Sequence, residues 1–386
     1  MNRFITAVAA LLLASVAPAQ EEDPAKEAAK VVDQVAKKAD PEKEKDPNRG
    51  RFLAIPLFIT EPAIGQGLGA GLIYFHREKP ETPSVVSAQE LGKTADNPNK
   101  PPPTATGIFG MYTNNDTAAV GIGHARTFKD DRYRLIGALA SARINATYYL
   151  GDRPFRFGLD GEILFSKLKR RMGDSNFFLG AAVSVVDATV EWKYQPNTQE
   201  LSPFIDFDFT DVGVSLSAIY DSRDDTMSPT KGGQIDLSLW RYDESIGGDF
   251  NYSKGRLKMH MFRQLLDDWA FGLRFDTEWS NGNVPFYAEP FVRLRGIPAL
   301  RFSGERAGVV EMELRYRFAK RWGLVGFAGK GFVEEIKDVV STENDIKAYG
   351  FGVRFQALEK QNVWLGIDVA KGPEETVWYI QMGHPW

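Results

Sequence analysis

Apolar and polar side chains alternate along most of the chain after Phe52. The stretch 309–319 shows this pattern most clearly, because its large apolar residues are separated one by one by charged residues. The apolar residues are Val310, Met312, Leu314, Tyr316 and Phe318, and the charged residues between them are Glu311, Glu313, Arg315 and Arg317. Since successive side chains of a β-strand point to opposite faces, the pattern predicts a strand with one apolar and one charged face.

The same alternation recurs, and it predicts strands at 376–386, 362–370, 347–357, 322–333, 309–319, 269–280, 249–263, 234–242, 211–221, 176–192 and 155–168. Many of the alternating segments are about 9–13 residues long, the length that a tilted strand needs to cross a bilayer. The region before residue 152 is less regular. Arg132–Leu150 fits one long strand or a hairpin, and Arg51–Thr60 fits a strand or a lead-in. Either choice gives 16 strands.

Short and long connections alternate between these segments. The short ones are 265–268, 319–321 and 359–362, and the long ones are 78–104, 194–210, 281–308 and 334–346. Short turns at one end and long loops at the other are typical of an outer-membrane barrel, whose strands alternate between lipid and lumen. Tryptophans near strand ends fit the aromatic girdles of such barrels. We therefore predict an all-β fold, a transmembrane antiparallel β-barrel over residues 51–386.

The N-terminus predicts export. Arg3 precedes an apolar stretch from Ile5 to Val16, and the small residues Ala17 and Ala19 follow. This pattern is typical of a cleaved secretory signal peptide over residues 1–19, and the apolar run is shorter than the ~20 residues that span a bilayer. Residues 20–50 are rich in charged residues and alanine, which favours a charged periplasmic linker or a short amphipathic helix. The expected location is the outer membrane.

Composition excludes several function classes. The chain has no cysteine, so disulfides cannot hold it together, and a net charge of -4 gives no basic footprint for nucleic acid. Its 4 histidines lie in no recognisable hydrolase motif. No spacing of residues fits a metal site or a dinucleotide-binding loop. We therefore expect no enzymatic activity, no cofactor and no nucleic-acid partner.

Four motifs point to a family. "RLRGI" at Arg293–Ile297 follows the expected eleventh strand, and "YDSRDDTMSPTKGG" at Tyr220–Gly233 follows the eighth from the same count. "GFAGKG" begins at Gly326, and the glycine-rich "PAIGQGLGAGLIYF" begins at Pro62. In this order the motifs resemble those of the bacterial surface antigen family, the BamA- and TamA-like barrels that insert or translocate proteins and lipids at the outer membrane. The residues that match the family's turn motif are Asp221, Arg223, Asp224, Pro229 and Gly232.

The resemblance implies a plug-like loop before the twelfth strand. In the family the arginine of the loop motif, here Arg295 beside Gly296 and Ile297, folds into the lumen and contacts carboxylates of neighbouring strands. A buried guanidinium needs acceptors, and Glu311 and Glu313, which flank Arg315 on the next strand, are the expected lumen partners. Gly329 stands where the family has aspartate. The sequence alone also leaves open that Arg295 is a solvated loop residue.

The chain also departs from the family. Between Gln20 and Arg51 there is no room for the periplasmic POTRA domains, so the chain resembles a short branch of barrel alone. Trp378 and the C-terminal Trp386 resemble the signal by which assembly machinery recognises outer-membrane clients. Pro385 lacks a backbone N–H, which would weaken the last strand. The first strand would be easy to distort, or simply able to curve, because it contains Gly67, Gly69 and Gly71.

Two functions follow as expectations. The first is an outer-membrane insertion or translocation barrel, with a plug anchored by Arg295 and a gate between its first and last strands. Its partners would be outer-membrane lipid and lipopolysaccharide, the assembly machinery during its own insertion, and a protein or lipid client. The alternative is a passive structural barrel or gated pore without an assembly role.

Overall fold

The computed structural model describes residues 51–61, 63–76, 104–129, 131–150, 153–193, 206–334, 346–358, 362–383 and 386. The expected signal peptide and the expected linker or helix lie outside these residues. So do large parts of the connections expected at 78–104, 194–210 and 334–346. Within the described ranges, no helix is long and apolar enough to cross a membrane.

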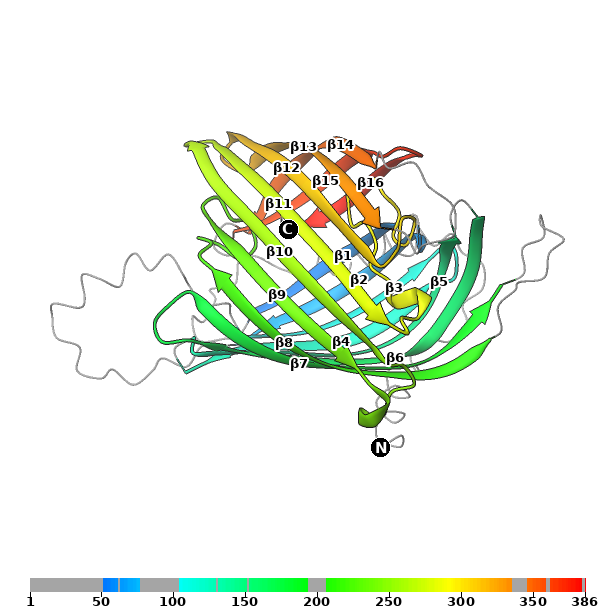
Figure 1. The fold of residues 1–386 in the computed structure, drawn as a ribbon. Helices are drawn as coiled ribbons and strands as arrows, with labels where there is room; N and C mark the ends of the chain where they lie inside the picture. The colour runs from blue at the N-terminus through cyan, green and yellow to red at the C-terminus, as the bar shows by residue number, and fades with distance from the viewer. Residues whose placement is uncertain are drawn as a thin grey trace.

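The described chain forms one antiparallel sheet of 16 strands that pair in sequence order and curve into a barrel (Figure 1). The strands are β1 (Arg51–Glu61), β2 (Gly65–Phe75), β3 (Ala105–Thr113), β4 (Ala118–Phe128), β5 (Tyr133–Leu150), β6 (Arg153–Arg171), β7 (Phe177–Trp192), β8 (Phe207–Asp221), β9 (Gly232–Tyr242), β10 (Tyr252–Leu266), β11 (Trp269–Gly282), β12 (Arg306–Ala319), β13 (Trp322–Glu334), β14 (Lys347–Leu358), β15 (Val363–Lys371) and β16 (Thr376–Met382). The predicted barrel is confirmed, and Arg132–Leu150 contributes one strand instead of a hairpin.

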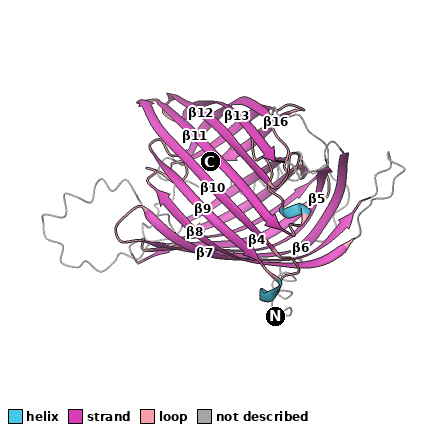
Figure 2. Cartoon of the chain, viewed as in Figure 1, coloured by secondary structure: helices cyan, strands magenta, loops and turns pink. Residues whose placement is uncertain are grey.

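Two short 3-10 helices interrupt the connections of the described chain, η1 (Glu244–Ile246) and η2 (Phe286–Ala288), and strands make up the wall (Figure 2). The barrel end at which β1 begins and β16 ends is called the terminal end below, and the opposite end is called the loop end. Strand alternation puts the connections after β7, β11 and β13 at the loop end. The connection between β2 and β3 lies at the terminal end, so the expectation that all long connections share one end is wrong.

The barrel is nearly closed. β1 and β16 lie close to each other. The hydrogen-bonded ladder runs from β1 to β16 without joining these two strands within the described residues. β16 has 7 residues and β1 has 11, so much of the edge of β1 has no partner of matching length. This gap in the ladder between β1 and β16 is called the seam below.

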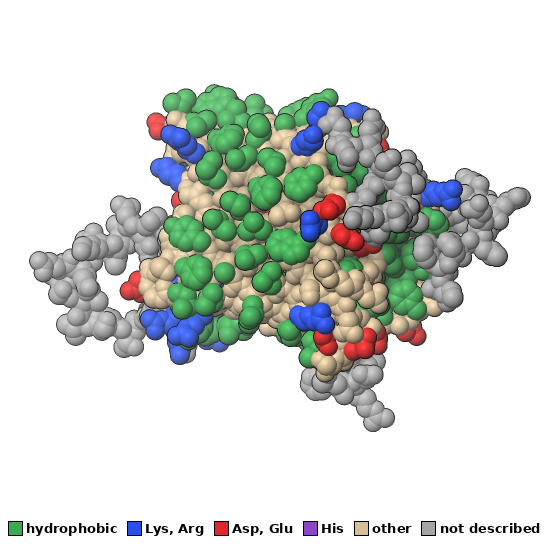
Figure 3. Space-filling view, viewed as in Figure 1, with side chains coloured by type: hydrophobic (Ala, Val, Ile, Leu, Met, Phe, Trp, Pro, Cys, Tyr) green, Lys and Arg blue, Asp and Glu red, His purple; other side chains and the backbone are tan. Residues whose placement is uncertain are grey.

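Lipid-facing and lumen-facing residues alternate as expected in β12. Val310, Met312 and Leu314 are exposed on the outside, whereas Glu311 and Glu313 are fully buried inside at 0% exposure. Hydrophobic side chains cover much of the visible outer wall, and most charged side chains lie toward its rims (Figure 3). Because lipid tails offer no hydrogen bonds, only the lumen can hold the charges of this strand.

The inner wall is divided into two regions of different chemistry. From β10 to β15 it carries buried charged residues, among them Arg274, Glu311, Arg354 and Asp368. Over β1 to β5 the inward positions are mostly apolar or glycine, as the register of neighbouring strands shows for Ile55↔Gly71 and for the other pairs along these strands. Both faces of the first strands are therefore apolar.

In β6 the apolar face expected from the sequence points inward near the loop end. Phe157 and Leu159 are buried in a cluster with Ala146 and Val190, and Phe286 of η2 packs against it. Asp160 lies on the outer side, where its Oδ2 accepts a hydrogen bond of 2.8 Å from Nε of Arg143. β6 has 19 residues, more than the ~9–11 that cross a bilayer, so this pair can lie beyond the hydrocarbon.

The expected last strand, 376–386, is too long. β16 ends at Met382, and Gly383 follows with φ of 77°, a left-handed conformation that glycine adopts at little cost. Trp386, which was expected on the last strand, lies beyond its end. Its ring is buried against the inward-facing rings of His260 and Phe262 on β10, at centroid distances of 5.7 and 5.6 Å. Trp386 therefore lies inside the barrel, where its apolar ring is shielded from water.

Candidate functional site

The connection between β11 and β12, residues 283–305, folds back into the barrel and is called the plug loop below. An isolated antiparallel bridge joins Phe291 and Ser303, so the loop has the shape of a short irregular hairpin. The amide of Val292 donates to the carbonyl of Phe302 over 2.9 Å, and the amide of Gly304 donates to the carbonyl of Pro290 over 3.0 Å. These bonds hold the loop together before it meets the wall.

A tight turn at the tip of the plug loop presents Arg295. The amide of Ile297 donates to the carbonyl of Leu294 over 3.0 Å, which closes a four-residue turn. Gly296 occupies the third position with φ of 90°, as a type II turn requires. A Cβ at Gly296 would also lie 3.1 Å from the amide nitrogen of Gly372. Glycine therefore serves both the backbone conformation and the close approach to the β15–β16 turn.

Arg295 is surrounded by three carboxylates of the barrel wall. Its Nε lies 2.6 Å from Oε1 of Glu311, and its Nη2 lies 2.8 Å from Oε2 of Glu313. Its Nη1 lies 3.1 Å from Oδ2 of Asp368 on β15. The guanidinium carbon also lies 3.5 Å from the ring centroid of Phe327, which adds a cation–π contact. Every nitrogen of the guanidinium thus has an anionic partner.

The surrounding guanidinium groups balance these carboxylates. Glu311 also pairs with Nη2 of Arg274 at 2.8 Å, and Glu313 pairs with Nε of Arg315 at 2.6 Å. Asp368 pairs with Arg354, whose Nη2 lies 3.0 Å from Oδ2. The three carboxylates are at 0% exposure, so each needs this pairing to remain ionised. Removing one member of such a buried network leaves an uncompensated charge.

Gly329 of β13 leaves room for the plug loop. A Cβ at this position would lie 2.6 Å from Cδ1 of Leu294 and 2.9 Å from the carbonyl oxygen of Val310. Leu294 is buried in an apolar cluster with Val292, Ile297 and Val309. Gly329, which stands where the resembled family has aspartate, therefore leaves room for Leu294 of the loop. Asp368 of β15 supplies a carboxylate to Arg295 from a different strand.

The plug loop contacts both sides of the seam. The amide of Gly296 donates to Oη of Tyr379 on β16 over 3.0 Å, and the amide of Ala299 donates to Oε1 of Glu61 on β1 over 3.0 Å. Arg301 donates from Nε to Oε1 of Glu374, in the turn that precedes β16, over 2.7 Å. The plug loop thus connects the first and last strands where the ladder does not.

The turn between β8 and β9 folds against the inner wall at the terminal end, where Ser228 donates a hydrogen bond to the carbonyl of Asn362. Asp221 pairs with Arg223 at 2.9 Å, and Asp224 accepts hydrogen bonds from the amide and hydroxyl of Thr230. The carbonyl of Pro229 accepts a hydrogen bond of 2.6 Å from Nη1 of Arg315. Gly232 begins β9 with φ of 84°. The turn motif therefore reaches the Arg295 network through Arg315.

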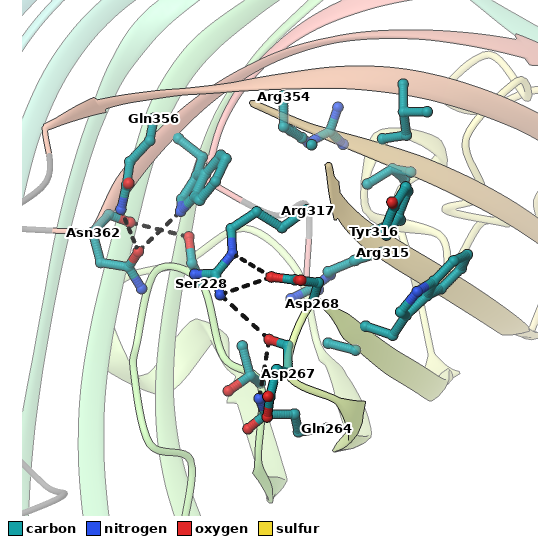
Figure 4. A pocket seen from close by; sticks show the side chains of 17 residues that line it. Ser228, Gln264, Asp267, Asp268, Arg315, Tyr316, Arg317, Arg354, Gln356 and Asn362 are labelled. Carbon is teal, nitrogen blue, oxygen red and sulfur yellow. Dashed lines mark hydrogen bonds and ion pairs between the residues drawn. The ribbon is translucent and has the colours of Figure 1, made fainter. Parts of the chain in front are cut away.

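A cavity of about 240 Å³ lies beside this turn, at the terminal end (Figure 4). Arg317 donates to a carboxylate oxygen of Asp268 over 3.0 Å, and Asn362 accepts from Trp364 over 2.9 Å. Arg315 and Arg354 line the same cavity. The inner charges therefore border a polar space at the end opposite the plug loop.

The structure places the predicted site residues in separate parts of the barrel. Arg295, Glu311, Glu313 and Arg315 meet in one network, and the turn residues join it through Pro229. Gly67, Gly69 and Gly71 lie in β2, one strand from the seam, and Trp378 is exposed on the outer face of β16. The sequence did not single out Asp368, Arg354 and Arg274, which are charged residues on the inward side of β15, β14 and β11. The only signal for them was their place on the polar face of a strand in which apolar and polar residues alternate.

Several solved outer-membrane barrels resemble this fold, among them BamA and CdiB. BamA from Haemophilus ducreyi lacking POTRA domains 1–3 has a TM-score of 0.58 at 14% identity, over 88% of this chain and 71% of that chain. CdiB from Escherichia coli has a TM-score of 0.58 at 12% identity, over 87% of this chain and 63% of that one. CdiB from Acinetobacter baumannii has a TM-score of 0.55 at 10% identity, over 86% and 59%.

The fold is therefore that of an outer-membrane β-barrel. It matches BamA, to whose family the sequence resemblance pointed, and also CdiB. No protein-family model and no curated sequence matches the chain. The chain spans about three fifths of the length of either CdiB structure. At these identities the comparison concerns the fold.

The network around Arg295 is suited to holding a loop in place. Among the described residues, no group of three or more histidine, aspartate or glutamate side chains could hold a metal ion. The buried carboxylates point toward arginines of the wall and of the plug loop, and each of the three is occupied by these contacts. Such pairs give geometric specificity, because a guanidinium offers several donors in a fixed plane.

Proposed function

We propose that this chain is an outer-membrane barrel that inserts or translocates a protein or lipid client, with the plug loop as its internal stopper and the seam as its exit. The observation that carries the proposal is the contact of one loop with both sides of the seam. Glu61 of β1 and Tyr379 of β16 each bind a backbone amide of the plug loop. A change in the loop would therefore act on both strands.

The energetics favour a gate over a permanent opening. The seam lacks a hydrogen-bonded ladder within the described residues, so few bonds oppose its separation. The loop contacts at Gly296 and Ala299 stabilise the two edges against each other. Displacing Arg295 from Glu311, Glu313 and Asp368 would release the loop, and with it these two bonds. A client that binds the released loop better than the docked one would shift the barrel toward the open form.

The proposal includes the remaining expectations from the sequence. Export would follow from a cleaved signal peptide over residues 1–19. The partners would be outer-membrane lipid and lipopolysaccharide around the wall, and the assembly machinery during insertion. Trp378 lies on the lipid-facing side of β16, where that machinery can reach it. The experiment below decides whether the client is a protein or a lipid.

The test is to lock the seam. The native chain contains no cysteine, so introduced pairs are unique. Double-cysteine variants would scan inward positions Ile55 and Leu57 of β1 against Tyr379 and Gln381 of β16. Cells depleted of the native protein would be complemented with each variant, and the protein and lipid composition of their outer membranes would be measured. Single-cysteine variants, and cross-linked pairs after reduction, are the matched controls.

We expect depletion of the native protein to change the outer-membrane composition. Cross-linked variants should fail to restore the native composition until their disulfide is reduced. If a cross-linked variant restores the composition as well as the native chain does, the seam is not an exit. If depletion changes nothing, the alternative of a passive structural barrel or gated pore is favoured. In that case the only role of the charges in the lumen would be to set the ion selectivity of the pore.

A further inference from the structure

An apolar cavity of about 350 Å³ lies on the inner side of the first strands, away from the Arg295 network. Its inward-facing lining includes Ile55 and Leu57 of β1, Ile73 of β2, Phe109 of β3 and Ala138 of β5. Small-molecule sites in proteins occupy about 300–1,000 Å³ and are mostly apolar, so this cavity has the size and the chemistry of a ligand site. The proposed gating mechanism does not use it.

Glycines create the space. Gly71, Gly107 and Gly123 face inward on three successive strands and line the cavity. A Cβ at Gly71 would lie no closer than 3.7 Å to its nearest neighbour, and one at Gly123 no closer than 3.6 Å. Side chains would therefore fit sterically at both positions, and neither glycine has a positive φ. The wall does not need glycine at these two positions for packing, and a larger residue would fill the cavity.

The cavity extends to the seam. Gln381 of β16 lines it from the lumen side, and Leu365 and Ile380, whose positions alternate to the lipid-facing side, line it as well. β1 and β16 share no ladder within the described residues. The apolar cavity therefore reaches the seam, where a lipid tail could enter from the bilayer past the unpaired edges of β1 and β16.

Cations border the cavity on its other side. Ala138 lines the cavity, and the next inward residue of β5, Ile136, is the register partner of Lys167 on β6. Nζ of Lys167 lies 3.9 Å from Oδ2 of Asp236, which is itself the register partner of Lys258 on β10. The wall thus changes from apolar at Ala138 to charged at Lys167, which lies two residues further along β5 and one strand across.

This charged region has excess positive charge. Lys169, Arg256 and Lys258 also face inward, and none lies within 4.0 Å of a carboxylate in the part of the chain that the structure describes. The neighbouring acids are engaged elsewhere. Asp276 accepts a hydrogen bond of 2.9 Å from His260, and Glu278 pairs with Lys254 at 3.0 Å. These cations are therefore available to an anion in the lumen.

We infer that the lumen binds an anionic phospholipid, with one acyl chain in the apolar cavity and the phosphate on the cations of β6 and β10. The apolar cavity would hold the acyl chain, which could enter from the bilayer at the seam. The adjacent lysines and arginine would bind the negatively charged headgroup. A protein segment would need hydrogen-bonding groups along its path, and the cavity lining supplies few of them. This inference concerns a different part of the lumen from the plug loop.

The test is lipid retention by the purified barrel, measured by native mass spectrometry after release from detergent with dioleoylphosphatidylglycerol or dioleoylphosphatidylcholine. The cavity would be filled by Gly71→Leu and Gly123→Leu. Gly326→Leu is the matched control, because Gly326 is exposed on the outer face and has no atom within 4 Å of its Cβ position. A Lys167→Gln/Lys169→Gln double variant tests the headgroup contacts. Heat-modifiable migration on gels would check that each variant is folded.

We expect the native barrel to retain phosphatidylglycerol in preference to phosphatidylcholine. Filling the cavity should reduce retention of both lipids about tenfold, a change of about 1.4 kcal/mol, and the control should match the native chain. The lysine variant should lose the preference for phosphatidylglycerol and keep phosphatidylcholine binding. Equal retention by the filled variants and Gly326→Leu would overturn the site, and so would a native barrel that retains neither phospholipid. An unchanged preference in the lysine variant would overturn the headgroup assignment.

Discussion

Nη1 of Arg295 lies 3.1 Å from Oδ2 of Asp368, a residue 73 positions further along the chain. The loop between β11 and β12 is thereby attached to β15, three strands away from β12 in the sheet. Because Asp368 is also held by Arg354, this contact joins the plug loop to a fixed part of the wall. The predictions below follow from this attachment and from the residues around it.

Substitution of Arg295 should weaken the docking of the plug loop. Arg295→Ala leaves three buried carboxylates with one cation fewer, and breaking a buried pair costs about 3–5 kcal/mol. Arg295→Lys keeps the charge, but its single ammonium cannot satisfy three carboxylates in one plane, so an intermediate loss is expected. Limited proteolysis within 283–305 would measure both. Equal protection of the native chain and Arg295→Ala would argue against docking through this residue.

A side chain at Gly329 should destabilise the barrel. Gly329→Ala forces Cβ against Leu294 and the carbonyl of Val310, and overpacking of this kind costs about 1–3 kcal/mol. The control is Gly326→Ala on the same strand, because its Cβ would meet no atom within 4 Å. Thermal unfolding in detergent would compare the two variants. The account requires a lower midpoint for Gly329→Ala alone, and equal midpoints would show that Leu294 moves aside freely.

Docking of the plug loop should depend on pH through Glu289. Burial raises the pKa of this carboxyl group, and hydrogen bonds from Ser303 and Tyr148 offset the effect only in part. A raised folded-state pKa means that the group contributes stability below its unfolded value of about 4.3, and that this contribution is lost as pH rises through the folded value. Glu289→Gln should therefore raise the unfolding midpoint at neutral pH and have little effect near pH ~4.

The control for this pH dependence is Glu244→Gln, because Glu244 is an exposed residue of η1. Its substitution should leave the midpoint unchanged at both pH values. A neutral-pH midpoint that falls in Glu289→Gln would show that the ionised carboxylate stabilises the loop, opposite to the direction expected from its burial.

Loss of the C-terminal ring should loosen the terminal end of the barrel. Trp386→Ala removes a ring packed against His260 and Phe262, and large-to-small substitutions of buried aromatic residues cost about 3–5 kcal/mol. Trp378→Ala removes a ring of the same kind from the lipid-facing side and serves as the control. Heat-modifiable migration would report stability. A smaller effect for Trp386→Ala than for Trp378→Ala would contradict the inward position of the last residue.

Much of the fold could be predicted from the sequence because alternation with a period of two fixes strands and their faces. The charges at Glu311 and Glu313 are expensive in lipid, so their inward direction follows from composition. The partner Asp368 could not be predicted in the same way. Its contact with Arg295 depends on which wall residues the tip of the plug loop meets inside the barrel, which no local pattern encodes. The inward position of Trp386 could not be predicted either, because β16 ends at Met382 whereas alternation alone would continue the strand.

The inward apolar face of β6 shows another limit of the sequence. Alternation separates Phe157 and Leu159 from Asp160, but it does not say which set faces lipid. The plug loop decides this, because Phe286 supplies an apolar partner inside the barrel. A strand beside a water-filled lumen would have the opposite orientation.

Single-channel conductance would show whether Arg295 holds the plug loop inside the lumen. The purified native barrel and Arg295→Ala would be recorded in planar bilayers under identical conditions. The account predicts small, rare currents for the native chain and large or unstable currents for the variant, because release of the loop opens the lumen. A steady open pore in the native chain, unchanged by Arg295→Ala, would contradict it.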